Sequence, residues 1–192
     1  MVEKVADRLI EKLTIRKTLS DHMKEWYKYV LVGMIEKILG VFVVALAGFA
    51  TGRFPEVLVY YFFVRGLRQW TGGYHCERSG QCLLLSVCVA VMAIVSEKAF
   101  CCQPWIIVFG ITLSVIIILI IGTVNHINMN LTLGELKRMK RKARCVAVVE
   151  ALAAFAFVVV GCEHYASYMV SAMLTCAVSM AVAKIIKQEV QR

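Results

Sequence analysis

Residues 105–124 read WIIVFGITLSVIIILIIGTV and contain no charged side chain. A helix of about 20 residues is long enough to cross a hydrocarbon core of about 30 Å. Residues 29–50 form a second apolar run of similar length. These two runs predict transmembrane helices and therefore a membrane-embedded protein.

Four further apolar runs complete the pattern. Residues 146–162 and 165–183 are slightly shorter and follow each other closely, so they predict a transmembrane hairpin. Residues 54–70 and 82–100 are also apolar, but charged residues lie near their ends: Arg65, Arg68, Glu97 and Lys98. We therefore expect an all-α, polytopic membrane protein whose domain, residues 29–192, contains about six transmembrane helices.

Residues 1–28 show a different pattern. Apolar residues fall on one stripe of a helix, and charged residues fall on the other face: Val2, Val5, Ala6, Leu9, Ile10 and Leu13 against Glu3, Lys4, Asp7, Arg8, Glu11 and Lys12. We expect an N-terminal amphipathic helix that lies either on the membrane surface or against the protein itself.

The composition narrows the class of protein. The chain has 192 residues, of which 60% are hydrophobic, and a formal net charge of +9. This apolar fraction excludes a disordered chain and a small disulfide-rich secreted module. The basic residues are divided among long apolar runs, a pattern that argues against nucleic-acid binding. We expect the lipid bilayer as a partner and no nucleic acid.

The basic residues predict the orientation. They concentrate before residue 29, after residue 183 and in an expected loop at residues 125–145, which holds Lys137, Arg138, Lys140, Arg141, Lys142 and Arg144. Because such regions stay on the cytoplasmic side, six spans place both termini, this loop and the segment 68–82 in the cytoplasm of a multi-pass plasma-membrane protein. The basic loop serves either to fix topology and bind anionic lipids or to dock an acidic peptide.

The segment from Arg68 to Cys82, RQWTGGYHCERSGQC, fits neither a lipid-facing span nor an ordinary loop. Ionisable residues at the edge of a span are candidates for function. A cysteine nucleophile needs a base that takes its proton, and His75 lies seven residues before Cys82. On one straight helix these side chains would be about 10 Å apart. A direct pair therefore requires a break at Gly72 and Gly73, a bend, or a helix that begins after His75.

The pattern of Arg68, Gly72, Gly73, His75 and Cys82 ahead of an apolar span resembles the AgrB family (accessory gene regulator protein B). Members of this family are integral-membrane cysteine endopeptidases of Gram-positive quorum-sensing systems. The resemblance implies that Cys82 is the nucleophile and His75 its base. It assigns Arg68, Gly72 and Gly73 supporting roles and implies no cofactor.

The resemblance also implies a substrate and a reaction. The substrate is an AgrD-like precursor peptide with an acidic C-terminal tail, and Cys82 attacks the carbonyl carbon where the signal segment meets this tail. A thiol or hydroxyl of the precursor then attacks the acyl-enzyme thioester and closes a thiolactone or lactone ring. The residues alone leave two other classes open: a non-enzymatic peptide exporter or accessory membrane subunit, and a thiol redox or metal protein.

The remaining candidate residues predict structural roles. We expect four further cysteines to behave as small buried hydrophobes: Cys88, Cys145, Cys162 and Cys176. We expect no metal site, because His75, Cys76 and Cys82 would lack a fourth zinc ligand. Glu150 lies inside a span and either faces the interior or pairs with a basic residue.

Small residues favour close helix packing. Faces with such residues include Ala45, Gly48 and Ala181. They pack helices either within the chain or in a homodimer.

Overall fold

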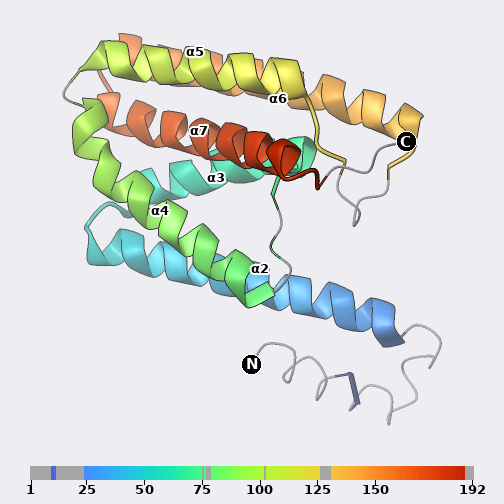
Figure 1. The fold of residues 1–192 in the computed structure, drawn as a ribbon. Coiled ribbons are helices and arrows are strands. Elements are labelled where there is room, and N and C mark those ends of the chain that lie inside the picture. Colours follow the sequence, from blue (N-terminus) through green and yellow to red (C-terminus); the bar gives the residue numbers. More distant parts are fainter. Residues whose placement is uncertain are drawn as a thin grey trace. The chain divides into compact units, whose positions relative to one another are not determined.

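The computed structural model describes residues 10–11, 24–74, 76, 79–101, 103–125 and 131–188. This part of the chain is helical and contains no strand (Figure 1). Its long helices are α2 (Lys24–Ala50), α3 (Phe54–Thr71), α4 (Ser79–Cys101), α5 (Pro104–Ile121), α6 (Leu133–Val159) and α7 (Glu163–Ile185). The prediction of an all-α fold is confirmed.

The chain divides into two compact units, Met1–Val43 and Val44–Arg192. In the first unit, Ile10 and Glu11 are helical, and α2 begins at Lys24. The rest of the predicted amphipathic helix lies outside the described residues, so that helix stays a prediction.

Helix α7 is the centre of the second unit. It packs against α3, α4, α5 and α6 (Figure 1). Several of its small side chains are completely buried: Ala166, Ser167, Ala172, Ala177 and Ala183. Small residues let helix backbones approach closely, which stabilises helix packing in a membrane. Helix α7 is therefore the scaffold that positions the other helices of this unit.

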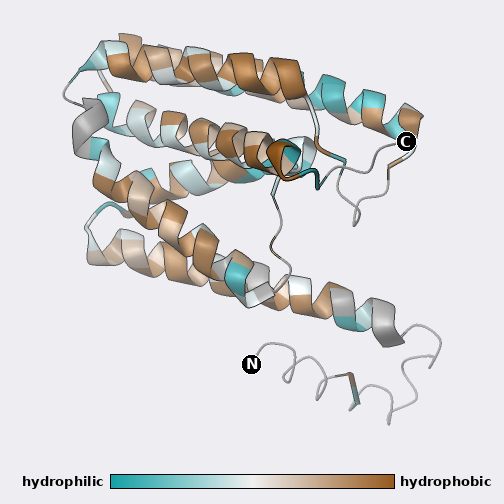
Figure 2. Cartoon of the chain, viewed as in Figure 1, coloured by the Kyte–Doolittle hydropathy of each residue, from teal (hydrophilic) through white to brown (hydrophobic). Residues whose placement is uncertain are grey.

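Four helices of the described part are long and apolar enough to cross a membrane. They are Val30–Ala50, Gly80–Glu97, Pro104–Ile121 and Glu163–Ile185. On α5, Phe109 and Ile120 are 63% and 74% exposed, and Figure 2 shows the apolar colour along this helix. A bilayer would cover such a surface. The prediction of a polytopic membrane protein is confirmed.

Helices α3 and α6 carry more charge than these four. Helix α3 has Glu56, Arg65 and Arg68 within 18 residues. Helix α6 ends at Val159 rather than at residue 162, and its first turns are basic. Gly161 has φ +81°, and a glycine in this left-handed conformation commonly ends a helix. The number of six spans therefore stays a prediction.

One small-residue face is used within the chain. A methyl group at Gly48 would lie 3.1 Å from Cα of Phe54 and 3.2 Å from Cβ of Val57. The rings of Phe49 and Phe54 stack beside it, with centroids 4.1 Å apart. Gly48 therefore closes the turn between α2 and α3, and the homodimer stays a prediction.

Candidate active site

The helices of the second unit form two groups of ends, and the first group gathers around the end of α3. The amide of Val124, after α5, donates a hydrogen bond to the Thr71 carbonyl at 2.9 Å. The hydroxyl of Thr123 donates to the Trp70 carbonyl, also at 2.9 Å. On α6, the Lys142 ammonium lies 4.3 Å from the centre of the Trp70 ring. We call this group, with the end of α7 near Ser179, the basic end.

Arg68 fixes the chain that leaves α3. Its guanidinium donates hydrogen bonds to the Ser179 hydroxyl of α7 and, at 2.5 Å, to the Tyr74 carbonyl. The amide of Tyr74 donates to the carbonyl and to the hydroxyl of Ser179, both at 3.1 Å. Residues 72–74 are thus held on α7 by backbone and side-chain contacts, so the predicted supporting residue Arg68 has a defined partner set.

Two glycines make this path possible. Gly72 has φ +65° and Gly73 has φ +131°, conformations that side chains with a Cβ rarely adopt. A methyl group at Gly73 would also collide with the Arg68 guanidinium and lie 2.7 Å from the Ser179 hydroxyl. The structure therefore brings three of the predicted site residues together: Arg68, Gly72 and Gly73.

Cys82 lies in the first turn of α4, which begins at Ser79. Its thiol-bearing side chain is half-buried, and its carbonyl accepts a hydrogen bond from the Ser86 hydroxyl at 2.9 Å. His75 lies outside the described residues, so the Cys82–His75 pair stays a prediction. Helix α3 ends at Thr71 and the next helix begins four residues after His75. The separation of about 10 Å for one straight helix therefore does not apply.

The basic residues expected in a loop at 125–145 lie largely in a helix. From Leu133 onward they form the first half of α6. Thr132 caps this helix: its hydroxyl accepts a hydrogen bond from the Glu135 amide, and the Glu135 carboxylate accepts one from the Thr132 amide. Hydrogen bonds from the Thr132 side chain and backbone lower the pKa of the Glu135 carboxyl. The exposed cations of this half are Lys137, Arg138, Arg141, Lys142 and Arg144.

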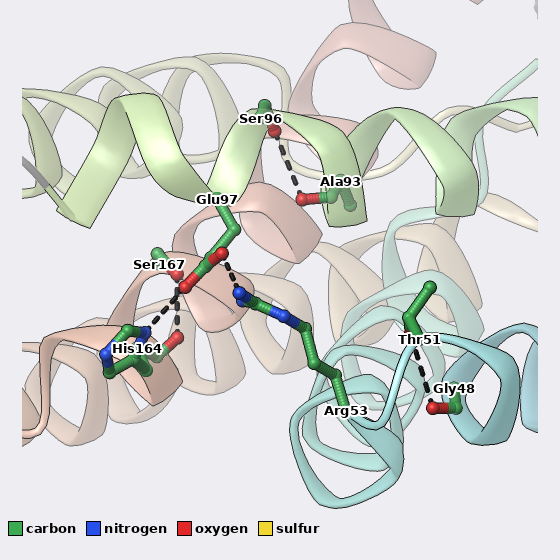
Figure 3. Close-up of polar contacts among 8 residues, drawn as sticks. All are labelled: Gly48, Thr51, Arg53, Ala93, Ser96, Glu97, His164 and Ser167. Atoms are coloured by element: carbon green, nitrogen blue, oxygen red, sulfur yellow. Dashed lines mark hydrogen bonds and ion pairs between the residues drawn. The ribbon is translucent and has the colours of Figure 1, made fainter.

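The second group of helix ends holds an ion-pair cluster that we call the ion-pair end. Glu97 of α4 is only 2% exposed and pairs with Arg53, which lies between α2 and α3. His164, in the first turn of α7, has its Nδ1 atom 2.6 Å from the other Glu97 oxygen (Figure 3). Burial lowers the pKa of the Arg53 guanidinium, but Tyr168 and Glu97 raise it by more, so this side chain stays charged.

Sequence reasoning missed Ser179, the partner of Arg68 on α7, and the whole ion-pair end. Ser179 had a signal, because hydroxyl residues recur every four positions along α7: Ser167, Ser171, Thr175 and Ser179. Such spacing puts them on one helix face. The sequence indicates the ion-pair end more weakly. Glu97 lies near the end of one apolar run, and His164 lies just before another.

The other predicted residues have mixed outcomes. Cys176 is buried as expected, whereas Cys88 and Cys145 are exposed on the protein surface, so that expectation was wrong for these two. Cys88 lies in an apolar helix segment, where burial by lipid differs from burial by protein, and Cys145 directly follows the basic residues of α6. Glu150 is 9% exposed, and its carboxylate packs over Gly66 of α3. Within the described ranges, His, Cys, Asp and Glu side chains form no group of three that could hold a metal ion.

The fold and the site define a polytopic helical membrane protein with a glycine turn anchored by an arginine and a half-buried cysteine in the first turn of the next long helix. The family model of accessory gene regulator B matches residues 2–185, and the chain belongs to this AgrB family. This family is associated with the processing of accessory gene regulator peptides.

Two curated relatives come from Clostridium perfringens. "Putative AgrB-like protein 2" of strain 13 / Type A is 26% identical over 91 residues, and "Putative AgrB-like protein" of strain SM101 / Type A is 25% identical over 91 residues. Each match covers 47% of this chain and 42% of the relative, so the chain spans less than half the length of these relatives in the match. No solved structure matches the chain.

Proposed function

We propose that this protein is a membrane-embedded cysteine endopeptidase. It cleaves the acidic C-terminal tail from an AgrD-like precursor peptide and assists cyclisation of the remaining segment. The observation that carries this proposal is the position of Cys82. Its thiol is half-buried in the first turn of α4, eight residues along the chain from Tyr74, which Arg68 and Ser179 hold in place.

The position of Cys82 suits a nucleophile. The positive end of a helix dipole favours a thiolate over a thiol, and a neighbouring imidazole strengthens this effect. His75 directly follows Tyr74, which α7 holds, and lies seven residues before Cys82 in the sequence. The presence of an imidazole so near the thiol in the sequence supports the proposed pair of base and nucleophile.

The reaction proceeds in two transfers. The Cys82 sulfur attacks the carbonyl carbon of the scissile peptide bond, and the amine of the tail leaves with a proton from the His75 imidazolium. The resulting acyl-enzyme thioester is attacked by a thiol or hydroxyl of the precursor, whose proton returns to His75. This second transfer releases Cys82 and a thiolactone or lactone peptide. A site that holds the precursor ends together and keeps water out favours ring closure over hydrolysis.

Arg68 acts as a positioning residue in this proposal. Its guanidinium donates to Ser179 and Tyr74 within the protein, so it stabilises the glycine turn instead of the substrate. The acidic tail meets the exposed cations of α6, which lie at the same end of the bundle because Lys142 contacts Trp70. A cluster of basic residues at one end supports a cytoplasmic location of this end.

The decisive experiment replaces Cys82 by alanine and measures cleavage of a co-expressed precursor. Cys82→Ala should abolish cleavage while membrane insertion is retained. Cys88→Ala is the matched control, because Cys88 is an exposed cysteine six residues further along the same helix. Cys76→Ala tests the second thiol beside His75 and should keep activity. Cleavage at the wild-type rate by Cys82→Ala would refute the endopeptidase and favour an exporter or accessory subunit.

A further inference from the structure

The ion-pair end links three elements through one buried carboxylate. Glu97 lies on α4, Arg53 precedes α3, and His164 opens α7 (Figure 3). The side chain of Glu97 is 2% exposed, whereas those of Arg53 and His164 are 31% and 67% exposed. The Glu97 carboxylate is therefore the central member of the cluster, and Arg53 supplies the charge that balances it.

The protein contacts of α4 in the second unit concentrate in its second half. Ala90 and Ala93 are buried against Val57, Tyr60 and Tyr168 of α3 and α7. Glu97 follows one turn later. By contrast, the first half of α4 is mostly exposed: Gln81, Leu84, Leu85, Ser86 and Cys88. The second half of α4 therefore holds the helix in the bundle.

Cys82 lies near the other end of α4 from Glu97. The two residues are 15 positions apart in the sequence. At 1.5 Å per residue this is about 22 Å, and a tilt of about 5° at the ion-pair end would displace Cys82 by about 2 Å. A displacement of about 1 Å at a reacting group can reduce a rate by about 100-fold.

We propose that the contact of Glu97 with Arg53 and His164 is a clasp that sets the tilt of α4 and thereby positions Cys82 for reaction at the opposite end. Glu97, Arg53 and His164 are positioning residues. This inference rests on the proposed function of Cys82. It adds a second determinant of activity on the other side of the bundle, remote from the substrate.

The burial of the three side chains predicts an asymmetry between variants. Removal of Arg53 takes the balancing cation away from a nearly inaccessible carboxylate, and an outward movement of α4 would hydrate that carboxylate. The double variant Arg53→Met/Glu97→Gln removes both charges, so no buried negative charge is left without its balancing cation. The double variant should therefore resemble the wild type more closely than Arg53→Met does. Arg53→Lys keeps the charge and should retain most activity.

The experiment uses the alkylation rate of the Cys82 thiol, which depends on its accessibility and reactivity, to detect a change in its surroundings. Purified full-length protein is alkylated with a maleimide, and mass spectrometry of peptides gives the rate at Cys82 relative to Cys145, an exposed cysteine on α6. Arg53→Met should change this ratio by about threefold or more and lower kcat for the precursor about tenfold, with KM little changed. Abundance in the membrane should stay close to that of the wild type.

A second pair of variants tests whether the packing of α4 affects Cys82 without changing any charged residue. Ala93→Leu inserts a larger side chain where α4 meets the bundle and should alter the Cys82 ratio in the same way. Met92→Leu is the matched control, because Met92 is 66% exposed and Ala93 is 5% exposed.

Unchanged Cys82 ratios in both Arg53→Met and Ala93→Leu would overturn the clasp, as would an equal change at Cys82 and Cys145, which indicates general loosening. The labelling ratio does not depend on peptide cleavage. If Cys82→Ala cleaves normally, the proposed function fails while the ratio still decides whether the clasp positions α4.

Discussion

The two ends of the helix bundle differ in whether their charged side chains are buried or exposed. At the ion-pair end, the Glu97 carboxylate is buried and balanced by Arg53. At the basic end, the cations of α6 are exposed. One of them, Lys142, also contacts the Trp70 ring. Buried charges need fixed partners, whereas exposed charges of one sign attract a partner from outside. The difference supports our proposal that one end maintains geometry and the other meets the substrate.

After Cys82→Ala, the largest effect should come from replacement of Arg68, the arginine of the basic end that is bonded within the protein. Arg68→Met removes two hydrogen bonds from a charged donor, each worth about 1.5–3 kcal/mol, and weakens the attachment of residues 72–74 to α7, which then depends on the Tyr74 amide. Precursor cleavage should fall by at least about 100-fold. Arg65→Met is the matched control, since Arg65 is exposed on the same helix. Equal activity of the two variants would show that the turn does not need its anchor.

Gly73→Ala should have the next largest effect. An added methyl group meets Arg68 and Ser179, and the residue has φ +131°. The conformation alone costs about 1–2 kcal/mol, so we expect cleavage to fall about tenfold and the melting temperature to fall. Gly134→Ala is the control, because no atom lies within 4 Å of a methyl group there. A fully active Gly73→Ala protein would indicate that the turn adapts freely.

The helices were largely predictable from the sequence because hydropathy determines them. The run at residues 105–124 gives α5, and the less apolar run at residues 82–100 gives α4, which also meets the length and hydropathy of a span. The end of α6 was not predictable from hydropathy, because Val160 is apolar and the stop depends on the conformation of Gly161. Apolar composition thus predicts where a helix exists better than where it ends.

The candidate site was predictable only in part. Arg68, Gly73 and Cys82 stand out because charged, glycine and thiol groups interrupt the apolar pattern. The partner of Arg68 is Ser179, 111 residues away; the spacing of hydroxyl residues on α7 indicates a polar helix face but does not say which residue pairs with Arg68. Glu97 and His164 are likewise far apart, 67 residues, and the sequence does not indicate that they pair. Tertiary contacts of this kind depend on helix packing, which composition does not specify.

Neutralising exposed cations of α6 should have a moderate effect on binding of the precursor, which tests whether the basic end meets the substrate. The triple variant Lys137→Gln/Arg138→Gln/Arg141→Gln should raise KM for the acidic precursor several-fold and leave kcat nearly unchanged, because exposed charge pairs are individually weak. Its KM should also depend less on salt concentration. The matching variant Lys137→Arg/Arg138→Lys/Arg141→Lys keeps the charge and should behave as the wild type. A kcat decrease at constant KM would place these residues in the reaction instead of in docking.

The smallest effect should come from the helix cap at the basic end. Thr132→Ala removes the hydroxyl that bonds the Glu135 amide and carboxylate, so the melting temperature should fall slightly at neutral pH. Because these bonds lower the pKa of Glu135 below its usual 4.5, their electrostatic contribution is present above pH 4.5 and is lost as the pH falls through the lowered pKa. The difference between wild type and variant should therefore shrink on acidification, as thermal unfolding in detergent across this range would show. A difference that is constant with pH would mean that the hydroxyl caps the backbone alone and does not stabilise the ionised Glu135 carboxylate.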